Sequence, residues 1–223
     1  MQTILSSSFK AVIFDMDNTL FDFYSCMKAG CEAAVSFLGK GTAEELYGYY
    51  FRGRYSIEDH MNLQEFMEMH ECFSIEAYFK AAAAYDEAKM NTLTPYTGIL
   101  TTLSLLKKRG YRLAVVTDAY TYAAEERLKK TGLSGFFDEC VGYDTTGYKK
   151  PHHAPFECAL DLLNCKPYEA VYVGDSMRRD IEPASAVGMT AIHAEYGDRH
   201  ENETRARLFA ESPLDILRIL KVV

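Results

Sequence analysis

The chain has 223 residues, of which 48% are hydrophobic and 25% charged, values ordinary for a folded protein and too apolar for a disordered one. Its 32 acidic residues outnumber its 24 lysines and arginines, which gives a formal net charge of −8, and no basic block interrupts that balance. This charge argues against a nucleic-acid backbone as partner. It leaves room for a small anionic ligand, because a metal ion and a few local cations can reverse the field inside one cleft.

No run of the sequence approaches the roughly 18 apolar residues that a membrane span requires. The first ten residues, MQTILSSSFK, lack the basic start and apolar core of a secretory signal. The six cysteines form no CxxC pair and no zinc-ligand spacing, which indicates reduced thiols. We expect a cytoplasmic protein without a membrane partner, either a monomer or a homodimer.

The first predicted strand covers residues 11–14, and a segment of different texture follows it. Residues 22–93 contain no β-rich run, and their apolar positions recur at helical spacing. Between residues 22 and 92 there are 12 acidic and 6 basic residues, so a net charge of −6 lies in this segment. We expect a small helical domain inserted after the first strand, with residues 1–21 and 94–223 forming the other domain.

From residue 94 onward, short apolar runs alternate with helical patterns. The predicted strands are 113–116, 139–143, 170–173 and 190–193, and the predicted helices are 99–109, 121–130, 155–164, 183–187 and 214–220. The strand runs lack polar alternation, as is typical of parallel strands covered on both faces. The sequence therefore predicts an α/β protein with a doubly wound parallel sheet.

Two carboxylates stand where the first predicted strand ends. Asp15 closes the strand and Asp17 follows two residues later. Ligand sites of such sheets lie at the carboxyl ends of the strands. Two neighbouring carboxylates repel each other unless a cation lies between them. The pair suits a divalent metal with oxygen ligands, or a nucleophile with an acid/base partner.

Three further segments place reactive side chains just beyond predicted strands. Thr117 follows the second strand, Lys150 precedes Pro151 and a helix, and Asp175 lies in a Gly-Asp-Ser turn five residues before Asp180. Any one of these residues could be a helix cap or a loop residue. Together they can hold a metal, a nucleophile, a phosphate oxygen and a counter-charge.

The ordered motifs Asp-x-Asp-x-Thr, Thr, Lys-Pro and Gly-Asp-Ser-x-x-x-Asp resemble those of the haloacid dehalogenase superfamily of aspartate-nucleophile phosphohydrolases. The insertion after the first motif resembles the helical cap of its subfamily I. The resemblance covers essentially the whole chain. It implies a Rossmann-like catalytic core, Mg²⁺ as cofactor and a small phosphorylated metabolite as substrate.

The resemblance also implies a role for each motif residue. Asp15 would be the nucleophile that forms an aspartyl-phosphate, and Asp17 would protonate the leaving oxygen and then activate water. Thr117 would bind the phosphoryl group, and Lys150 would neutralise it together with the nucleophile. Dehalogenases of this fold lack a carboxylate two residues after the nucleophile, whereas phosphatases and mutases have one, so Asp17 favours phosphoryl transfer.

Metal ligation is implied in the same way. Asp175 would ligate Mg²⁺ together with the carboxylate of Asp15 and the backbone carbonyl of Asp17, and Asp180 would support or join this set.

Three residues outside the main motifs are candidates for substrate binding. Asp118 follows Thr117 and adds negative charge near a phosphate, so its side chain either points away or binds a substrate hydroxyl. Arg52 and Arg54 flank Gly53 in an aromatic, basic stretch of the insertion and are its best candidates to reach the cleft.

The resulting hypothesis is Mg²⁺-dependent hydrolysis of a small phosphomonoester. A sugar-phosphate mutase of the same family would share every motif and differ in how well the intermediate is shielded from water. A non-catalytic phosphate-binding or phospho-acceptor regulator is the alternative from another class, since receiver domains also combine an Asp cluster, a Thr and a Lys at strand ends.

Overall fold

The computed structural model describes residues 9–199 and 206–223. Most of the segment MQTILSSSFK, in which no secretory signal is expected, lies outside these residues. The described chain separates into two compact units, a helical unit of Phe23–Leu93 and an α/β unit built from the residues before and after it. None of the described helices combines the length and the apolar character needed to cross a membrane.

The α/β unit is built on one six-stranded sheet in which every pair of neighbours is parallel. Its strands are β1 (Ala11–Phe14), β2 (Arg112–Val116), β3 (Glu139–Val141), β4 (Ala170–Gly174), β5 (Thr190–Ala194) and β6 (Phe209–Ala210). The strand order is β3-β2-β1-β4-β5-β6, so the chain reverses its direction of winding at β1, between β2 and β4. The predicted α/β fold with a doubly wound parallel sheet is confirmed.

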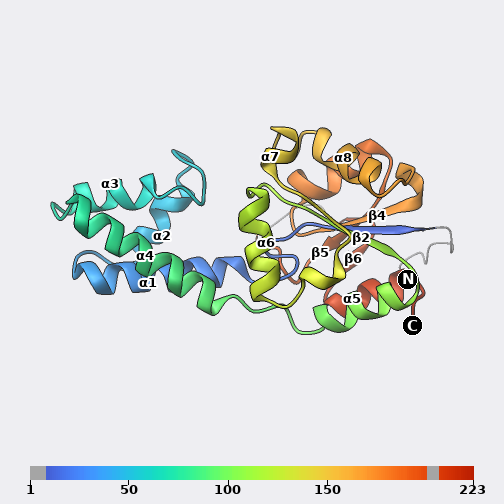
Figure 1. Cartoon of the computed structure of the whole chain (residues 1–223), viewed down its shortest axis with the longest axis horizontal. Helices are drawn as coiled ribbons and strands as arrows, with labels where there is room; N and C mark the ends of the chain where they lie inside the picture. Colours follow the sequence, from blue (N-terminus) through green and yellow to red (C-terminus); the bar gives the residue numbers. More distant parts are fainter. Residues whose placement is uncertain (1–8, 200–205) are drawn as a thin grey trace. The chain divides into compact units, whose positions relative to one another are not determined.

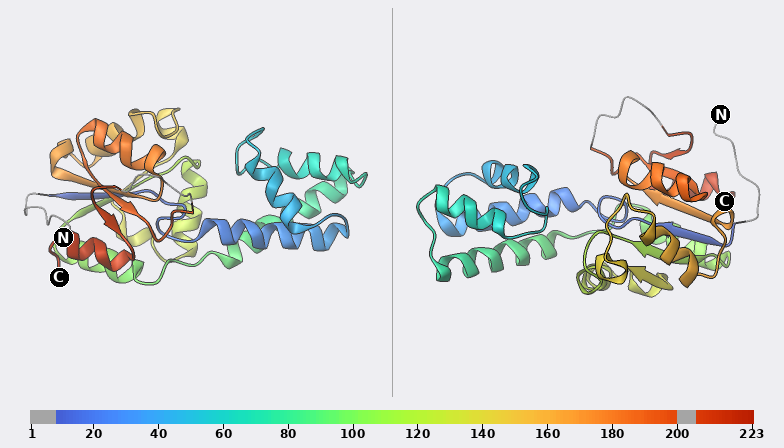
Figure 2. Two further views of the ribbon diagram at one scale, coloured as in Figure 1. Left: turned by 180° about the vertical axis from the view of Figure 1, so that it is seen from behind. Right: turned by 90° about the horizontal axis from the view of Figure 1, so that it is seen from above.

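Helices cover both faces of the sheet, as Figures 1 and 2 show. They are α5 (Ile99–Lys108), α6 (Thr121–Lys130), α7 (Tyr143–Thr146), α8 (Ala154–Leu162), α9 (Glu182–Val187) and α10 (Pro213–Ile219). On one face, Ile13 and Tyr172 pack with Phe156 of α8 and Ala184 of α9 in one buried cluster. The alternate strand residues point to the opposite face, where α5 and α10 lie. All residues of β1 are therefore fully buried.

The edges of the sheet differ from the sequence prediction. The strand expected at 139–143 ends at Val141, because Gly142 and Tyr143 begin the short helix α7, where the Gly142 N–H donates to Thr145 Oγ1 at 3.1 Å. The two-residue strand β6 was not predicted. Such a short strand has no periodicity of its own, and it exists through its pairing with β5.

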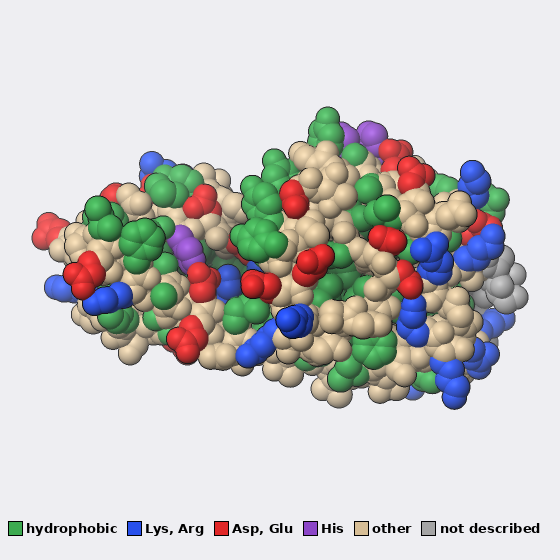
Figure 3. Space-filling view, in the orientation of Figure 1, with side chains coloured by type: hydrophobic (Ala, Val, Ile, Leu, Met, Phe, Trp, Pro, Cys, Tyr) green, Lys and Arg blue, Asp and Glu red, His purple; other side chains and the backbone are tan. Residues whose placement is uncertain are grey.

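The helical unit contains α1 (Phe23–Leu38), α2 (Ala43–Phe51), α3 (Met61–Met69) and α4 (Ile75–Thr92). Side-chain oxygens of Thr42 and Ser74 accept hydrogen bonds from the first turns of α2 and α4. Its interior is aromatic, with the rings of Tyr50 and Tyr85 stacked at 5.1 Å. The space-filling view shows exposed apolar groups beside charged ones on this unit (Figure 3).

Candidate active site

Asp15 lies directly after the central strand β1 and is 4% exposed. Its N–H donates to Val173 O of β4 at 2.8 Å, which extends the sheet by one residue. Asn18 has a positive φ of 62°, a conformation that asparagine tolerates better than most residues, and there the chain turns away from the strand. The turn brings Thr19 back, so its hydroxyl donates to Asp15 Oδ2 at 3.1 Å. The strand and the turn together hold the Asp15 carboxylate in place.

Lys150 is the counter-charge of this carboxylate. The Lys150 side chain is 1% exposed, and its Nζ donates to Asp15 Oδ1 and, at 2.6 Å, to Asp180 Oδ1. Burial alone would lower the pKa of Lys150, but the charges of Asp15 and Asp180 outweigh it and hold that pKa well above the ordinary value. Lys150 is therefore a fixed cation between two carboxylates.

Tyr172 also belongs to this group, although it was not predicted from the sequence. Its hydroxyl donates to Asp180 Oδ1 at 3.0 Å and lies 3.4 Å from Lys150 Nζ. Burial raises the pKa of Tyr172 well above its ordinary value, so the hydroxyl stays a donor. Within an apolar strand run, Tyr172 has the sequence signature of a core residue, and only its partners identify it as part of the site.

Asp175 and Asp180 follow strand β4 and complete an acidic cluster with Asp15. One oxygen from each of these three carboxylates lies within 4.8 Å of the others, and all three residues are buried. A π-helical turn over Met177–Ile181 returns Asp180 to the strand end, where its Oδ2 accepts from the Ser176 N–H at 3.1 Å. Gly174 permits this close approach, because a Cβ there would lie 2.5 Å from the Cβ of Asp180.

The acidic cluster fits a hard divalent cation. Asp175 Oδ1 is buried, and no described residue offers it a hydrogen bond. Burial, with the charges of Asp15 and Asp180, holds the pKa of Asp175 well above its usual range, and burial likewise raises the pKa of Asp15. A cation bound by carboxylate oxygens would offset that cost, and oxygen is the ligand that Mg²⁺ and Ca²⁺ take.

The loop after strand β2 supplies Thr117 and Asp118. The Thr117 hydroxyl accepts from the Ala119 N–H at 3.2 Å and can still donate its own hydrogen. Asp118 Oδ1 accepts from the backbone N–H of Lys150 at 2.8 Å, and its Oδ2 lies 3.4 Å from Arg179 Nη1. Asp118 thus connects this loop to the one that carries Lys150, a contact that was not predicted from the sequence.

Asp17 is held differently from Asp15. Both of its carboxylate oxygens accept from Arg127 Nη1 of helix α6, each at 3.0 Å. Its carboxylate is not among the three of the acidic cluster. Arg127 was missed in the sequence, because its position in a polar helix among Glu126 and Lys129 is typical of a solvated residue. Its burial, at 3% exposed, shows otherwise.

Arg52 and Arg54 belong to the helical unit and are exposed. Both pair with Glu65, with a distance of 2.6 Å between Arg54 Nη1 and Glu65 Oε1. The Arg52 guanidinium also lies 4.0 Å from the centre of the Tyr49 ring. Their expected part in substrate binding stays a prediction.

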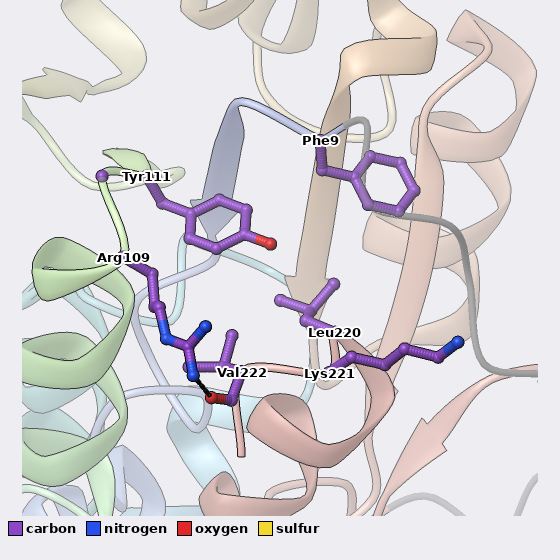
Figure 4. Close-up of a pocket in the computed structure, with 7 residues that line it drawn as sticks. Phe9, Arg109, Tyr111, Leu220, Lys221 and Val222 are labelled. Carbon is purple, nitrogen blue, oxygen red and sulfur yellow. Dashed lines mark hydrogen bonds between the residues drawn. The ribbon is translucent and has the colours of Figure 1, made fainter.

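A separate pocket of about 230 Å³ lies at the amino ends of the strands (Figure 4). Phe9 and Tyr111, which precede β1 and β2, line it with Arg109, whose Nη2 donates to Val222 O at 2.6 Å. The carboxyl ends of parallel strands lie at the other edge of a sheet, so this pocket contains none of the candidate residues.

Known proteins resemble this chain over most of its length. A glyceraldehyde 3-phosphate phosphatase of Methanothermobacter thermautotrophicus is 34% identical over 191 residues, covering 82% of this chain and 84% of that protein. A phosphoglycolate phosphatase of Aquifex aeolicus is 28% identical, covering 95% and 96% of the two chains. A solved structure of a candidate β-phosphoglucomutase from Thermotoga maritima shares the fold, with a TM-score of 0.80, 24% identity, and coverage of 96% and 99%.

The family model for haloacid dehalogenase-like hydrolases matches residues 12–194. That range runs from strand β1 to the end of strand β5, so it contains every candidate residue described above. The resemblance that the four motifs indicate is thereby confirmed. This chain belongs to the haloacid dehalogenase-like hydrolase family.

Proposed function

We propose that this protein is a Mg²⁺-dependent phosphatase that hydrolyses a small phosphomonoester through a phosphorylated Asp15. The main observation behind the proposal is the burial of Asp15 and the set of side chains that surround its carboxylate. Its carboxylate is buried at the end of the central strand, held by Lys150 and Thr19, and adjoins the carboxylates of Asp175 and Asp180. The phosphatases among the relatives support the same reaction class.

The reaction divides into two steps. An Asp15 oxygen attacks phosphorus and the bond to the leaving oxygen breaks, while Asp17 gives that oxygen its proton. Water then attacks phosphorus and passes a proton to Asp17, and the bond from phosphorus to Asp15 breaks. Phosphoryl transfer depends mainly on alignment and charge neutralisation. Lys150 supplies a fixed positive charge here, and the Thr117 hydroxyl can donate to a phosphoryl oxygen.

Mg²⁺ would be held by Asp15 and Asp175, with Asp180 in support and the Asp17 backbone carbonyl as a further predicted ligand. When bound, it would supply positive charge against the phosphoryl oxygens. Asp180 also accepts from Lys150 and Tyr172, so in this proposal it positions Lys150 as well.

Phosphate release from a panel of esters tests the proposal. The panel contains p-nitrophenyl phosphate, glyceraldehyde 3-phosphate and phosphoglycolate, each with Mg²⁺ and with EDTA. We expect release that EDTA abolishes and Mg²⁺ restores, whereas Ca²⁺ inhibits because its looser coordination misaligns the attack. Release that persists undiminished in EDTA would exclude the metal-dependent mechanism.

A mutase remains the second candidate, because it would use the same residues. In the same assay it would release little phosphate and would require a bisphosphate activator for turnover. One solved structure that shares the fold is a candidate β-phosphoglucomutase, but a shared fold does not favour a mutase over a phosphatase.

Other parts of the hypothesis stay predictions of the sequence. They are the substrate-binding roles of Asp118, Arg52 and Arg54, the action of the helical unit as a cap domain, the cytoplasmic location, the monomeric or homodimeric state, and the lack of nucleic-acid and membrane partners. For Arg52 and Arg54, replacement by Gln should raise KM more than it lowers kcat.

A further inference from the structure

The contact between Arg127 and Asp17 joins two residues that are 110 positions apart in the chain. A single nitrogen, Arg127 Nη1, lies 3.0 Å from both oxygens of Asp17. The Arg127 side chain is 4% exposed and that of Asp17 is 20% exposed. An ion pair shielded on one side from water is worth more than an exposed one, and it restricts both side chains.

The two aspartates of the first motif therefore have separate cations. Lys150 contacts Asp15, and Arg127 contacts Asp17. Carboxylates two residues apart repel each other, and unscreened repulsion would turn their side chains away from a common substrate. Two cations from different elements fix each carboxylate independently of the other.

The geometry of the contact also suits a group that changes its protonation state. A carboxyl group that carries a proton on one oxygen keeps the other oxygen as an acceptor. Because Arg127 Nη1 is within hydrogen-bond distance of both oxygens, it can hold Asp17 in either state. A general acid that later acts as a base needs such a partner, since its position must be the same in both steps.

We propose that Arg127 is the positioning residue of Asp17, which it orients for proton transfer to the leaving oxygen and from the attacking water. This inference rests on the proposed phosphatase function. Helix α6, which contains none of the four motifs, would thereby contribute to catalysis through Arg127.

The test compares two substrates whose leaving groups differ in their need for a proton. A p-nitrophenolate needs little protonation as it departs, whereas an alkoxide needs it fully. If Arg127 orients Asp17, Arg127→Met should lower kcat for an alkyl phosphate by about 10- to 100-fold, as a partial loss of the acid–base contribution. The rate of the initial p-nitrophenol burst from p-nitrophenyl phosphate, which reports the first step alone, should fall by no more than about threefold. A lost structural contact would lower both rates by a similar factor.

Three variants serve as controls. Arg127→Lys keeps a positive nitrogen, and since one nitrogen is enough to reach both oxygens of Asp17, we expect it to restore most of the alkyl phosphate activity. Lys129→Met removes the same charge from an exposed position of α6 and should change neither rate. In the Asp17→Asn background, Arg127→Met should cost the alkyl phosphate little further activity, because residues that act as one unit are not additive.

Each outcome decides the question. A selective loss with the alkyl phosphate, restored by Lys and absent in the Asp17→Asn background, would support the proposal. Equal losses in kcat for the alkyl phosphate and in the p-nitrophenol burst rate, or a faster variant, would overturn it while the phosphatase function stands. If Arg127→Met does not fold, the test rests on Arg127→Lys. The proposal then requires that the rates of Arg127→Lys lie within about threefold of the wild-type rates. If the wild-type protein released phosphate from no ester, the proposed function would fail and this inference with it.

Discussion

The α/β unit and the helical unit bury polar groups in different ways. At the carboxyl end of its sheet, the α/β unit buries the acidic cluster and Lys150 together. The buried polar residues of the helical unit are Asn62, whose amide donates to two backbone carbonyls, and Lys89, which contacts Asp86 at 3.3 Å. Among the described residues, the only group of three metal-capable side chains lies in the α/β unit.

This contrast indicates that the polar groups buried in the α/β unit serve function, whereas the packing of the helical unit serves stability. Burying like charges costs free energy of folding, and such burial is found mostly at functional sites. The helical unit instead relies on ring packing, as in the stack of Tyr50 on Tyr85. Substitutions in the acidic cluster should therefore change activity more than stability, and substitutions in the ring packing should do the reverse.

The largest effect is expected at the nucleophile. Asp15→Asn keeps the shape of the side chain but removes the attacking carboxylate, so turnover of every ester should fall by on the order of 10³-fold or more. Phosphate release measures the loss, and circular dichroism checks that the fold is kept. Turnover within tenfold of wild type would remove Asp15 from its proposed role.

The next effect concerns Asp17. Asp17→Asn should slow hydrolysis of alkyl phosphates by about 10²–10⁴-fold, because both proton transfers are lost. With p-nitrophenyl phosphate we expect a burst of p-nitrophenol followed by slow release of phosphate, since the second step still needs a base. Equal losses for all leaving groups, with rescue by high Mg²⁺, would instead make Asp17 a metal ligand only.

A smaller effect is expected at Asp118. Asp118→Ala leaves the N–H of Lys150 without its acceptor and should lower kcat by about tenfold through misplacement of Lys150. Asp118→Asn keeps an acceptor oxygen and should stay close to wild type. If the Asn variant instead raised KM strongly, the sequence-based prediction of direct substrate binding would be supported over this positioning role.

The helical unit should respond in stability. In Gly30→Ala the new Cβ would lie 2.8 Å from ring atoms of Tyr85, so the free energy of unfolding should fall by about 1–3 kcal/mol. Gly48→Ala is the matched control, because apart from its chain neighbours and its own helix backbone no atom lies within 4 Å of the Cβ that would be added, and a helical alanine should stabilise by about 0.5–1 kcal/mol. Thermal unfolding distinguishes the two, and opposite signs are required.

The smallest expected effect is a dependence of the protein's stability on pH that arises from the acidic cluster. The pKa of Asp175 is raised in the folded protein, so the stability linked to its protonated form is present below the unfolded pKa of about 3.9 and is lost as the pH rises. In EDTA, Asp175→Asn should therefore stabilise the protein at neutral pH and hardly at all near pH 4. With Mg²⁺ the gain should vanish, because the metal stabilises only the wild type. Asp161→Asn, an exposed substitution on α8, should show none of these changes.

Local sequence determined most of the helices and strands and the places where chemistry could occur. The runs at 11–14 and 170–173 predict buried strands because a parallel strand covered on both faces is apolar throughout. Asp15 and Thr117 follow such runs directly, and Asp175 follows one after Gly174. Parallel strands bring their carboxyl ends to one edge of the sheet. The family motifs then imply that Lys150 neutralises the nucleophile and that Asp180 supports or joins the metal ligands. In the structure Lys150 contacts Asp15 and also Asp180, and the second contact was not predicted.

Only the tertiary structure decided which side chains meet across long separations. Arg127 looks like a solvated residue of a polar helix, and Tyr172 looks like a core residue of a strand, because local periodicity reports burial but not the partner that a polar atom finds. The tie from Asp118 to the backbone of Lys150 depends on two loops whose approach is set by the order of β1, β2 and β4. Hydrogen bonds of this kind join atoms placed by separate elements, so they leave no periodic trace in the sequence.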